Sequence, residues 1–390
     1  METDQSIIRN RPIFAWHMKP NKPRLRSLDF FRGLTVASMI LVNNPGDWSH
    51  IYAPLEHSVW NGCTPTDLVF PFFLFIVGVS IVYAMASKKT DPSNHRSLIL
   101  KAARRAATIY LLALVLNFIH NFDLSHLRLL GVLPRIAIVF FISTVIYIKT
   151  SRKTQIWIFW SILVAYYFIM NYIPVPGFGP SNLEPSTNLA AWLDRTLLTT
   201  NHMWSGSKTF DPEGVLSTLP AIATCLLGIF TGDWLQQKDR NAENKTAWLF
   251  SAAGLLIIGG LIWNGFFPMN KALWTSSFVL FTGGLAMAIL TFSYWIIDVY
   301  NRQRFTEPFV AFGSNAITIY VVSGYLPLLI GSIKFNDNGV PSNLWQYGYQ
   351  HLFASWLSPI NASVVSALVY VSLLSIPMIW MYRKKIFIKL

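Results

Sequence analysis

The chain has 390 residues, of which 53% are hydrophobic, 15% aromatic and only 13% charged. Soluble domains carry about 25% charged residues, so the composition excludes an ordinary soluble protein and indicates an integral membrane protein. The formal net charge of +13 would suggest a nucleic-acid partner in a soluble chain. In a membrane protein, however, basic residues first report topology.

The basic residues gather on one side of the membrane under a simple topology. With a cytoplasmic N-terminus and alternating spans, the cytoplasmic segments hold all but six of the 31 Lys and Arg residues. The exceptions are Arg128, Arg135, Arg195, Lys208, Lys271 and Lys334. This asymmetry follows the positive-inside rule, so we expect both termini in the cytoplasm and no nucleic-acid partner.

The chain begins with a polar segment, residues 1–23, that contains no apolar core. It is predicted to be a cytoplasmic N-terminal segment and not a cleavable signal peptide. The two cysteines, Cys63 and Cys225, fall at the head of one predicted span and inside another, so no disulfide framework is expected.

Apolar runs of about 20 residues, the length that crosses a bilayer as a helix, recur along the rest of the chain. They predict an all-α polytopic membrane protein with about ten transmembrane helices, forming a single domain over residues 24–390. The predicted spans lie near residues 29–45, 66–86, 103–121, 129–148, 155–173, 215–236, 246–266, 272–298, 308–331 and 359–382.

Two predicted outer loops are longer than the usual connection of about 4–6 residues. The loop over residues 173–214 is rich in Pro, Gly and Asn, which is typical of a lid or binding loop. The loop over residues 332–358 is rich in Trp and Tyr. It fits either an aromatic belt at the lipid headgroups or a short interfacial helix.

Polar residues cluster around the link between the first two spans, where lipid could not satisfy them. Those of interest are Asn43, Asn44, His57, Trp60, Asn61 and Asp67. An imidazole can take a proton from an attacking amine, a carboxylate can fix its tautomer, and amides can stabilise an oxyanion. His57 is therefore the first catalytic candidate, with Asp67 as its orienting group. The alternative is a hydrogen-bonded loop histidine with a structural role.

Charged residues near the predicted cytoplasmic ends form a second group. Asp29 and Arg32 are three residues apart, on one helical face, and are expected to pair. They could bind phosphate or simply anchor the helix at the interface. Arg104 and Arg105 begin the third span, where a nucleotide-bearing donor would arrive, but the positive-inside rule explains them equally.

Further polar residues lie at or within other spans. Arg135 sits in an apolar run, where an unpaired charge costs at least a few kcal/mol, so we expect it and Arg128 to belong to a pocket. Asp211 and Glu213 precede the sixth span, either as helix-capping acids or as ligands of an amino sugar. The roles of Asn270, Lys271 and Asn315 are left open.

Several chemistries have no motif here. The sequence contains no GxxxxGK loop, no HExxH, no CxxC and no HxxxxD. His50 and His57 lack a supporting acid at metal-ligand spacing, so no metal site is predicted.

The chain resembles the transmembrane acetyltransferases typified by heparan-alpha-glucosaminide N-acetyltransferase, in particular their bacterial members, which lack a large luminal domain. The similar stretches occur in order over most of the chain. They are RLRSLDFFRGLTVASMILVNNPG, HSVWNGCTPTDLVFPFFLFIVG, LRLLGVLPRIA, DPEGVLSTLPAIATCLLG, NKALWTSSFVL and PFVAFGSNAITIY. The chain is similar more weakly to the acyltransferase-3 family, which has histidine near the position of Asn43.

The resemblance implies an acyltransferase that moves acetyl from cytosolic acetyl-CoA to the amine of a terminal glucosamine on the outer side of the membrane. It implies that His57 is the catalytic histidine and that Asn43 is the asparagine ending the preceding span. Contacts to acetyl-CoA are expected from Asp29, Arg32, Arg104, Arg105, Arg128 and Arg135. Contacts to the acceptor are expected from Asn44, Trp60, Asn61, Asp211, Glu213, Asn270, Lys271 and Asn315.

Other hypotheses remain open at this point. Intramembrane charges would also suit a polytopic transporter of a sugar or glycan precursor, or the chain could be a non-catalytic assembly factor for envelope polysaccharide. The expected location is the bacterial inner membrane. The acceptor, the acyl chain length and the oligomeric state, monomer or homodimer, are left open.

Overall fold

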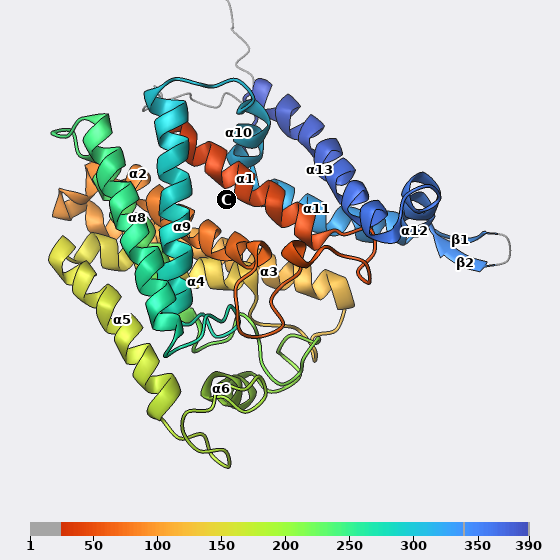
Figure 1. Ribbon diagram of the computed structural model, residues 1–390, viewed down its shortest axis with the longest axis horizontal. Helices are drawn as coiled ribbons and strands as arrows, with labels where there is room; N and C mark the ends of the chain where they lie inside the picture. Colours follow the sequence, from red (N-terminus) through yellow and green to blue (C-terminus); the bar gives the residue numbers. More distant parts are fainter. Residues whose placement is uncertain (1–24, 338–339, 389–390) are drawn as a thin grey trace, which may run out of the picture.

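The computed structural model describes residues 25–337 and 340–388. The predicted N-terminal segment, residues 1–23, lies outside these ranges. The described chain is a bundle of helices with one small antiparallel hairpin, as expected for an all-α polytopic membrane protein (Figure 1).

The helices follow one another along the chain, with the longer connections between α1 and α2, on both sides of α6, and after α11. They are α1 (Arg26–Asn43), α2 (Val69–Lys89), α3 (His95–Asn121), α4 (Val132–Lys149), α5 (Arg152–Tyr172), α6 (Leu189–Leu198), α7 (Thr218–Gln236), α8 (Ala242–Asn264), α9 (Ser276–Tyr294), α10 (Glu307–Ser314), α11 (Ala316–Gly331), α12 (Leu344–Tyr349) and α13 (Pro359–Arg383). The 3-10 turns are η1 (Ala53–Leu55), η2 (Pro65–Leu68) and η3 (Pro92–Asn94), and the π turns are η4 (Trp295–Val299) and η5 (Gln350–Ala354).

Seven of the described helices are long and apolar enough to cross a membrane, and the bent pair α10 and α11 makes up to eight. The seven are α2 with η2, α4, α5, α7, α8, α9 with η4, and α13. Helices α1 and α3 have 18 and 27 residues but do not meet the same test. A multi-pass membrane protein therefore follows from the structure, whereas the total of ten spans stays a prediction.

The predicted span over residues 308–331 is wrong as one continuous helix. It consists of α10 and α11, which meet at an angle of 89°. Asn315 lies at the break with a non-helical backbone (φ −126°, ψ 39°). Its side-chain amide donates to the carbonyl of Ile386 (3.1 Å) and its oxygen accepts from the N–H of Ile388 (2.9 Å). Hydrogen bonds between the Asn315 side chain and the C-terminal segment thus stabilise the break between α10 and α11.

The two long loops that were predicted to be external contain secondary structure of their own. The loop after α5 contains α6, and the loop after α11 contains strands β1 (Lys334–Asp337) and β2 (Val340–Asn343), followed by α12. The strands pair with Lys334 opposite Asn343. This hairpin and α12 project from the bundle beyond one end of α13 (Figure 1). A short helix, one of the two alternatives for this loop, is therefore present.

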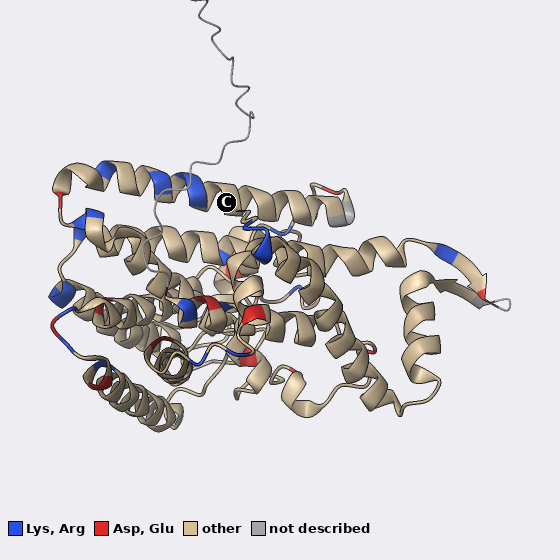
Figure 2. Cartoon of the chain, turned by 90° about the horizontal axis from the view of Figure 1, so that it is seen from above, with Lys and Arg blue, Asp and Glu red and all other residues tan. Residues whose placement is uncertain are grey.

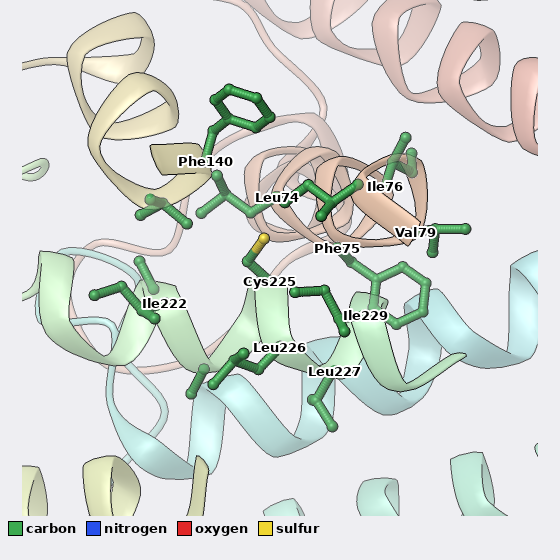
Figure 3. Packing of buried hydrophobic residues seen from close by; sticks show 14 of the residues in the cluster. Leu74, Phe75, Ile76, Val79, Phe140, Ile222, Cys225, Leu226, Leu227 and Ile229 are labelled. Atoms are coloured by element: carbon green, nitrogen blue, oxygen red, sulfur yellow. The ribbon is translucent and has the colours of Figure 1, made fainter. Parts of the chain in front are cut away.

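Helices α2 and α7 touch through their backbones at the centre of the core. A Cβ added to Gly78 would lie 2.0 Å from the carbonyl oxygen of Cys225, and one added to Gly228 would lie 2.0 Å from that of Phe75. Small residues allow such close approach between helices in membranes. Figure 3 shows the surrounding side chains, including Leu74 and Ile229, filling the space on either side of the contact.

Helices α1 and α10 meet in the same way, and this contact positions the break at Asn315. A Cβ on Gly33 would lie 1.6 Å from the carbonyl oxygen of Phe309, and one on Gly313 would lie 2.0 Å from that of Asp29. Because α1 also leads directly to Asn43, the end of α1 is fixed relative to α11.

Charges are distributed unevenly over the bundle. Lys and Arg gather towards the helix ends at one side of the molecule, on the left in Figure 2, whereas the centre contains acidic residues as well. This arrangement agrees with the charge asymmetry along the sequence.

Helix α6 anchors the segment that leads into α7. The buried carboxylate of Asp194 accepts the backbone N–H of Val215 (2.9 Å) and that of Asp211 (3.4 Å). A Cβ on Gly214 would lie 2.1 Å from Asp194 Oδ2, so only glycine fits beside this carboxylate. Burial raises the pKa of Asp194 to about 6, against the effect of these two N–H donors.

Replacing Gly78 with alanine is expected to destabilise the protein, because the added methyl group must displace the backbone of α7. Overpacking of this kind costs about 1–3 kcal/mol. The measurement is thermal unfolding in detergent, with Gly254→Ala in α8 as the control, since a Cβ there meets nothing within 4 Å. Equal melting temperatures for the two variants would contradict the backbone contact.

Because the pKa of Asp194 differs between the folded protein and the free side chain, the stability of the fold is expected to depend on pH. Its pKa in the folded protein, about 6, exceeds the value of 3.8 for the free side chain. The resulting stabilisation is present below about pH 4 and is lost as the pH rises through about 6. A shift of this size corresponds to about 3 kcal/mol. Asp194→Asn should flatten the dependence of the melting temperature on pH between these limits; an unchanged slope would show that another group is responsible.

Candidate functional site

A cavity of about 460 Å³ lies among the C-terminal half of α1, the N-terminal parts of α2, α4 and α11, and the loops before α2, α7 and α9. Seven of the residues singled out in the sequence line it. They are Asn43, His57, Trp60, Asp67, Arg128, Glu213 and Lys271. Segments far apart in the chain therefore converge on one chamber, of a size that suits a small-molecule ligand.

His57 and Asp67 form a hydrogen-bonded pair in this cavity. His57 Nδ1 lies 2.7 Å from Asp67 Oδ1, and the Asp67 side chain is 1% exposed whereas the His57 side chain is 49% exposed. The other carboxylate oxygen, Oδ2, accepts the backbone N–H groups of Ser58 (3.1 Å) and Thr64 (3.0 Å). A carboxylate at Nδ1 selects the tautomer with hydrogen on Nδ1, which leaves the lone pair on Nε2.

Local sequence explains why Asp67 points at the loop. Thr64 and Asp67 form a capping box at the start of η2, in which Asp67 also accepts the hydroxyl of Thr64 (3.1 Å). Pro65 begins the turn with a backbone angle already suited to it. The hydroxyl of Thr64 also lies 2.6 Å from the carbonyl oxygen of Glu56, so its single proton can be donated either to Glu56 or to Asp67. Both contacts tie the preceding loop to the start of η2.

Lys271 brings a positive charge against the imidazole. Its Nζ lies 3.1 Å from each ring nitrogen of His57 and 3.9 Å from Asp67 Oδ1. Burial lowers the pKa of Lys271, and the carboxylates of Glu213 and Asp67 act in the opposite direction. The ammonium is therefore placed where a lone pair or a developing negative charge would meet it.

The turn that carries Lys271 is held by Asn270, which is fully buried. Asn270 Oδ1 accepts the N–H of Leu273 (2.9 Å), and its Nδ2 donates to Asn61 Oδ1 (3.3 Å). The N–H of Gly62 donates to the carbonyl of Met269 (2.7 Å). Asn61 and Asn270, both expected to contact the acceptor, instead join the His57 loop to the Lys271 turn.

Arg128, Asp211 and Glu213 form an ion cluster at the cavity wall. Arg128 Nε and Nη2 donate to the two oxygens of Asp211 (3.0 and 2.6 Å), and Nη2 also donates to Glu213 Oε2 (2.7 Å). Burial acts to lower the pKa of Arg128, but the two carboxylates outweigh it and raise the pKa. The sequence assigned these residues to two different ligands, whereas the structure pairs them with each other.

Arg135 lies in α4 beside the cavity and is fully buried. Its Nη2 donates to the carbonyl of Gly214 (3.2 Å) and to the hydroxyl of Ser217. Its Nε and Nη1 have no partner among the described residues. The guanidinium lies 5.2 Å from the ring centroid of Trp274, within reach of a cation–π interaction. Arg135 is thus a fixed, incompletely satisfied cation in the protein interior.

The four charged residues assigned to the cytoplasmic side lie away from this cavity. Arg32 Nη1 bonds Asp29 (3.0 Å) and the carbonyl of Gly313 (3.1 Å), and its Nη2 bonds Ser80 (2.9 Å). The residues Arg104 and Arg105 are exposed. The expected pairing of Asp29 with Arg32 is confirmed, and this leaves Arg32 few free donors.

Two amides predicted to bind the acceptor contact the protein backbone. Asn44 Nδ2 donates to the carbonyl of Ile40 (2.9 Å), while Asn315 binds the C-terminal segment as described above and does not line the cavity. Trp60 does line it, and its indole N–H donates to the carbonyl of Leu183 (2.9 Å) in the outer loop.

Sequence reasoning missed Tyr320 and Trp204, which also line the cavity. Tyr320 follows Ala316 by four residues on α11, so both lie on the same face of that helix. That signal becomes readable only once the helix is known to begin at Ala316. Trp204 lies in an irregular loop, where no periodic pattern could identify it.

Comparison with known proteins identifies one family and two relatives that carry the same name. The family described as heparan-alpha-glucosaminide N-acetyltransferase, catalytic, matches residues 24–263. The human heparan-alpha-glucosaminide N-acetyltransferase is 28% identical over 96% of this chain and 61% of its own length. The mouse protein of the same name is 29% identical over 76% of this chain and 53% of its own length. The chain therefore spans between half and two thirds of these relatives.

The family match covers more than half of the chain and includes α1, the His57 loop, the ion cluster of Arg128 and the buried Arg135. On this evidence the chain belongs to the heparan-alpha-glucosaminide N-acetyltransferase family.

Proposed function

We propose that the protein is a membrane-embedded acetyltransferase that moves an acetyl group from acetyl-CoA to the amine of an amino sugar. The observation that carries the proposal is the His57–Asp67 pair, 2.7 Å apart, at the wall of a cavity of about 460 Å³. A histidine oriented by a buried carboxylate is a recurrent arrangement for acyl transfer.

In the proposed mechanism, the Nε2 atom of His57 transfers the proton. As the neutral amine of the acceptor attacks the thioester carbonyl, Nε2 takes the proton from that amine. Collapse of the tetrahedral intermediate breaks the C–S bond, and the proton passes to the departing CoA sulfur. If a covalent acetyl-histidine forms first, the same nitrogen is the nucleophile. Asp67 holds Nδ1–H in both sequences and stabilises the imidazolium.

Two groups are suited to stabilise the oxyanion of the intermediate. The amide of Asn43 lines the cavity and has no hydrogen-bond partner within the described chain. Lys271 contributes a positive charge 3.1 Å from the His57 ring. Fixed donors and charges of this kind favour a transition state because they need no rearrangement during the reaction.

The donor is proposed to arrive from the cytoplasm, and the acceptor from the outer side of a bacterial inner membrane. The basic helix ends support this direction, since CoA carries phosphates (Figure 2). Arg104 and Arg105 are the better candidates for those phosphates, because Arg32 is already bonded to Asp29, Ser80 and Gly313. Arg128 is assigned to the ion cluster with Asp211 and Glu213.

A transporter is the second candidate, and the broken helix favours it. Discontinuous membrane helices often surround substrate sites in secondary transporters, and α10 and α11 meet at 89° beside this cavity. The two functions differ in their need for donor. A transporter would accumulate labelled amino sugar in vesicles without acetyl-CoA, whereas the proposed enzyme releases CoA only when both substrates are present.

His57→Ala should abolish CoA release from a mixture of purified protein, acetyl-CoA and glucosamine, because no other imidazole is oriented at this position. The matched control is His50→Ala. His50 also lies in the outer link and also pairs with an aspartate, Asp47 (2.7 Å), but it does not line the cavity. The proposal fails if both variants lose activity equally or if His57→Ala retains it.

Asp67→Asn should lower kcat by about 10²- to 10⁴-fold while leaving the KM for acetyl-CoA nearly unchanged, because the imidazole loses its oriented tautomer. Steady-state kinetics over a range of pH and thermal unfolding should be measured together. Asp47→Asn is the control for loss of an aspartate beside a loop histidine. A fall in kcat that only parallels loss of folded protein would assign Asp67 a purely structural role.

A further inference from the structure

A second chamber, of about 440 Å³, adjoins the cavity that contains His57. It lies between the end of α1, the end of α3, the middle of α11 and the loop before α7. The two chambers share five lining residues: Met39, Asn43, Arg128, Trp204 and Tyr320. These residues form the boundary between the chambers, so a ligand in the second chamber can reach into the first.

Two polar groups at this boundary are available to a ligand. The amide of Asn43 and the hydroxyl of Tyr320 have no hydrogen-bond partner within the described chain. Two other polar groups of the second chamber are occupied. Asn117 donates to the carbonyl of Arg128 (3.0 Å), and the hydroxyl of Tyr325 donates to that of Leu116 (2.6 Å). Asn43 is exposed and Tyr320 is half-buried, so a ligand in the chamber can reach both groups.

The chemistry of the walls favours a hydroxyl-rich ligand without phosphate groups. Amide and hydroxyl groups both donate and accept, which suits sugar hydroxyls. The indole of Trp204 is 40% exposed and, with the rings of Tyr320 and Tyr325, offers a flat apolar surface to a sugar ring. Among the residues that the structure describes, Arg128 is the only Lys or Arg lining this chamber, and its donors are bound to two carboxylates. His126 also lines the chamber and pairs with Asp123 (2.7 Å). The chamber is therefore poorly suited to the phosphates of CoA.

The first chamber differs in character. Away from His57 it is walled by apolar side chains such as Val36, Phe70, Leu133 and Ile136. These suit an acyl thioester and its uncharged arm better than a sugar. The two substrates of a transferase thus have separate, chemically matched compartments that meet at Asn43 and Tyr320.

We infer that the second chamber binds the acceptor amino sugar and presents its amine across the boundary to His57. This inference rests on the proposed function and adds the location of the acceptor. Gly324 has a defined part in it. Gly324 lines the chamber, and a Cβ built on it meets nothing within 4 Å. The missing side chain leaves the space that the sugar ring occupies, so position 324 controls the size of the acceptor.

The test fills the chamber from Gly324 without disturbing the fold. Gly324→Ala and Gly324→Leu add increasing volume to the open side of α11. Gly254→Leu is the matched control, because Gly254 also lies in a helix, α8, with nothing within 4 Å of its Cβ, and lines neither chamber. Thermal unfolding is expected to be similar for Gly324→Leu and Gly254→Leu.

Glucosamine is the probe, in steady-state acetyl transfer and in titration calorimetry without donor. Gly324→Leu should raise the KM and Kd for glucosamine by at least about tenfold, which corresponds to 1.4 kcal/mol. Gly324→Ala should give a smaller increase, and Gly254→Leu none. The KM for acetyl-CoA should change by less than about twofold, because the donor lies in the other chamber.

The outcomes separate this inference from the proposed function. A protein that binds glucosamine but never releases CoA would refute the acetyltransferase, and loss of that binding in Gly324→Leu alone would still support the chamber assignment. Glucosamine binding that is absent, or equal in Gly324→Leu and Gly254→Leu, overturns the assignment. A raised KM for acetyl-CoA in Gly324→Leu overturns it as well, since the second chamber would then hold the donor.

Discussion

The site depends on one buried carboxylate. Asp67 receives His57, the backbone N–H groups of Ser58 and Thr64, and the hydroxyl of Thr64. A charge removed from water is tolerated only when it is paired or well hydrogen-bonded, and here the hydrogen-bond partners all come from the loop before α2. The same contacts that satisfy the carboxylate therefore fold the loop and aim the imidazole. Local structure and chemistry cannot be separated at this residue.

Packing among the helices supplies the frame for that loop. The glycine contacts between α1 and α10 and between α2 and α7 bring backbones together so closely that side chains cannot slide between them. In lipid, where hydrophobic burial contributes little to helix association, such close packing is a main source of cohesion. It fixes the ends of α1 and α2, and hence Asn43 and Asp67, relative to each other.

The sequence was most informative where the relevant contacts are local. His57 and Asp67 lie within eleven consecutive residues, so their pairing could be expected from the sequence, and the apolar runs predicted the helical membrane class. Contacts between distant segments were not readable. Nothing in the chain near Lys271 indicates that it lies against His57, 214 residues away, or that Arg128 would bind Asp211.

Hydropathy did not predict the break between α10 and α11, for the same reason. An uninterrupted apolar run predicts one helix unless something elsewhere satisfies the freed backbone groups. Here Asn315 binds Ile386 and Ile388, residues that lie beyond the last span. The composition of a single sequence does not show that a distant C-terminal segment will stabilise the break between two helices.

The break at Asn315 also connects two distant parts of the chain. Directly after Asn315, α11 contributes Ala316, Ile317 and Tyr320 to the cavity wall, while the side chain of Asn315 bonds the backbone of the C-terminal segment at Ile386 and Ile388. A single amide therefore connects the segment that follows α13 to a wall of the chamber that contains His57.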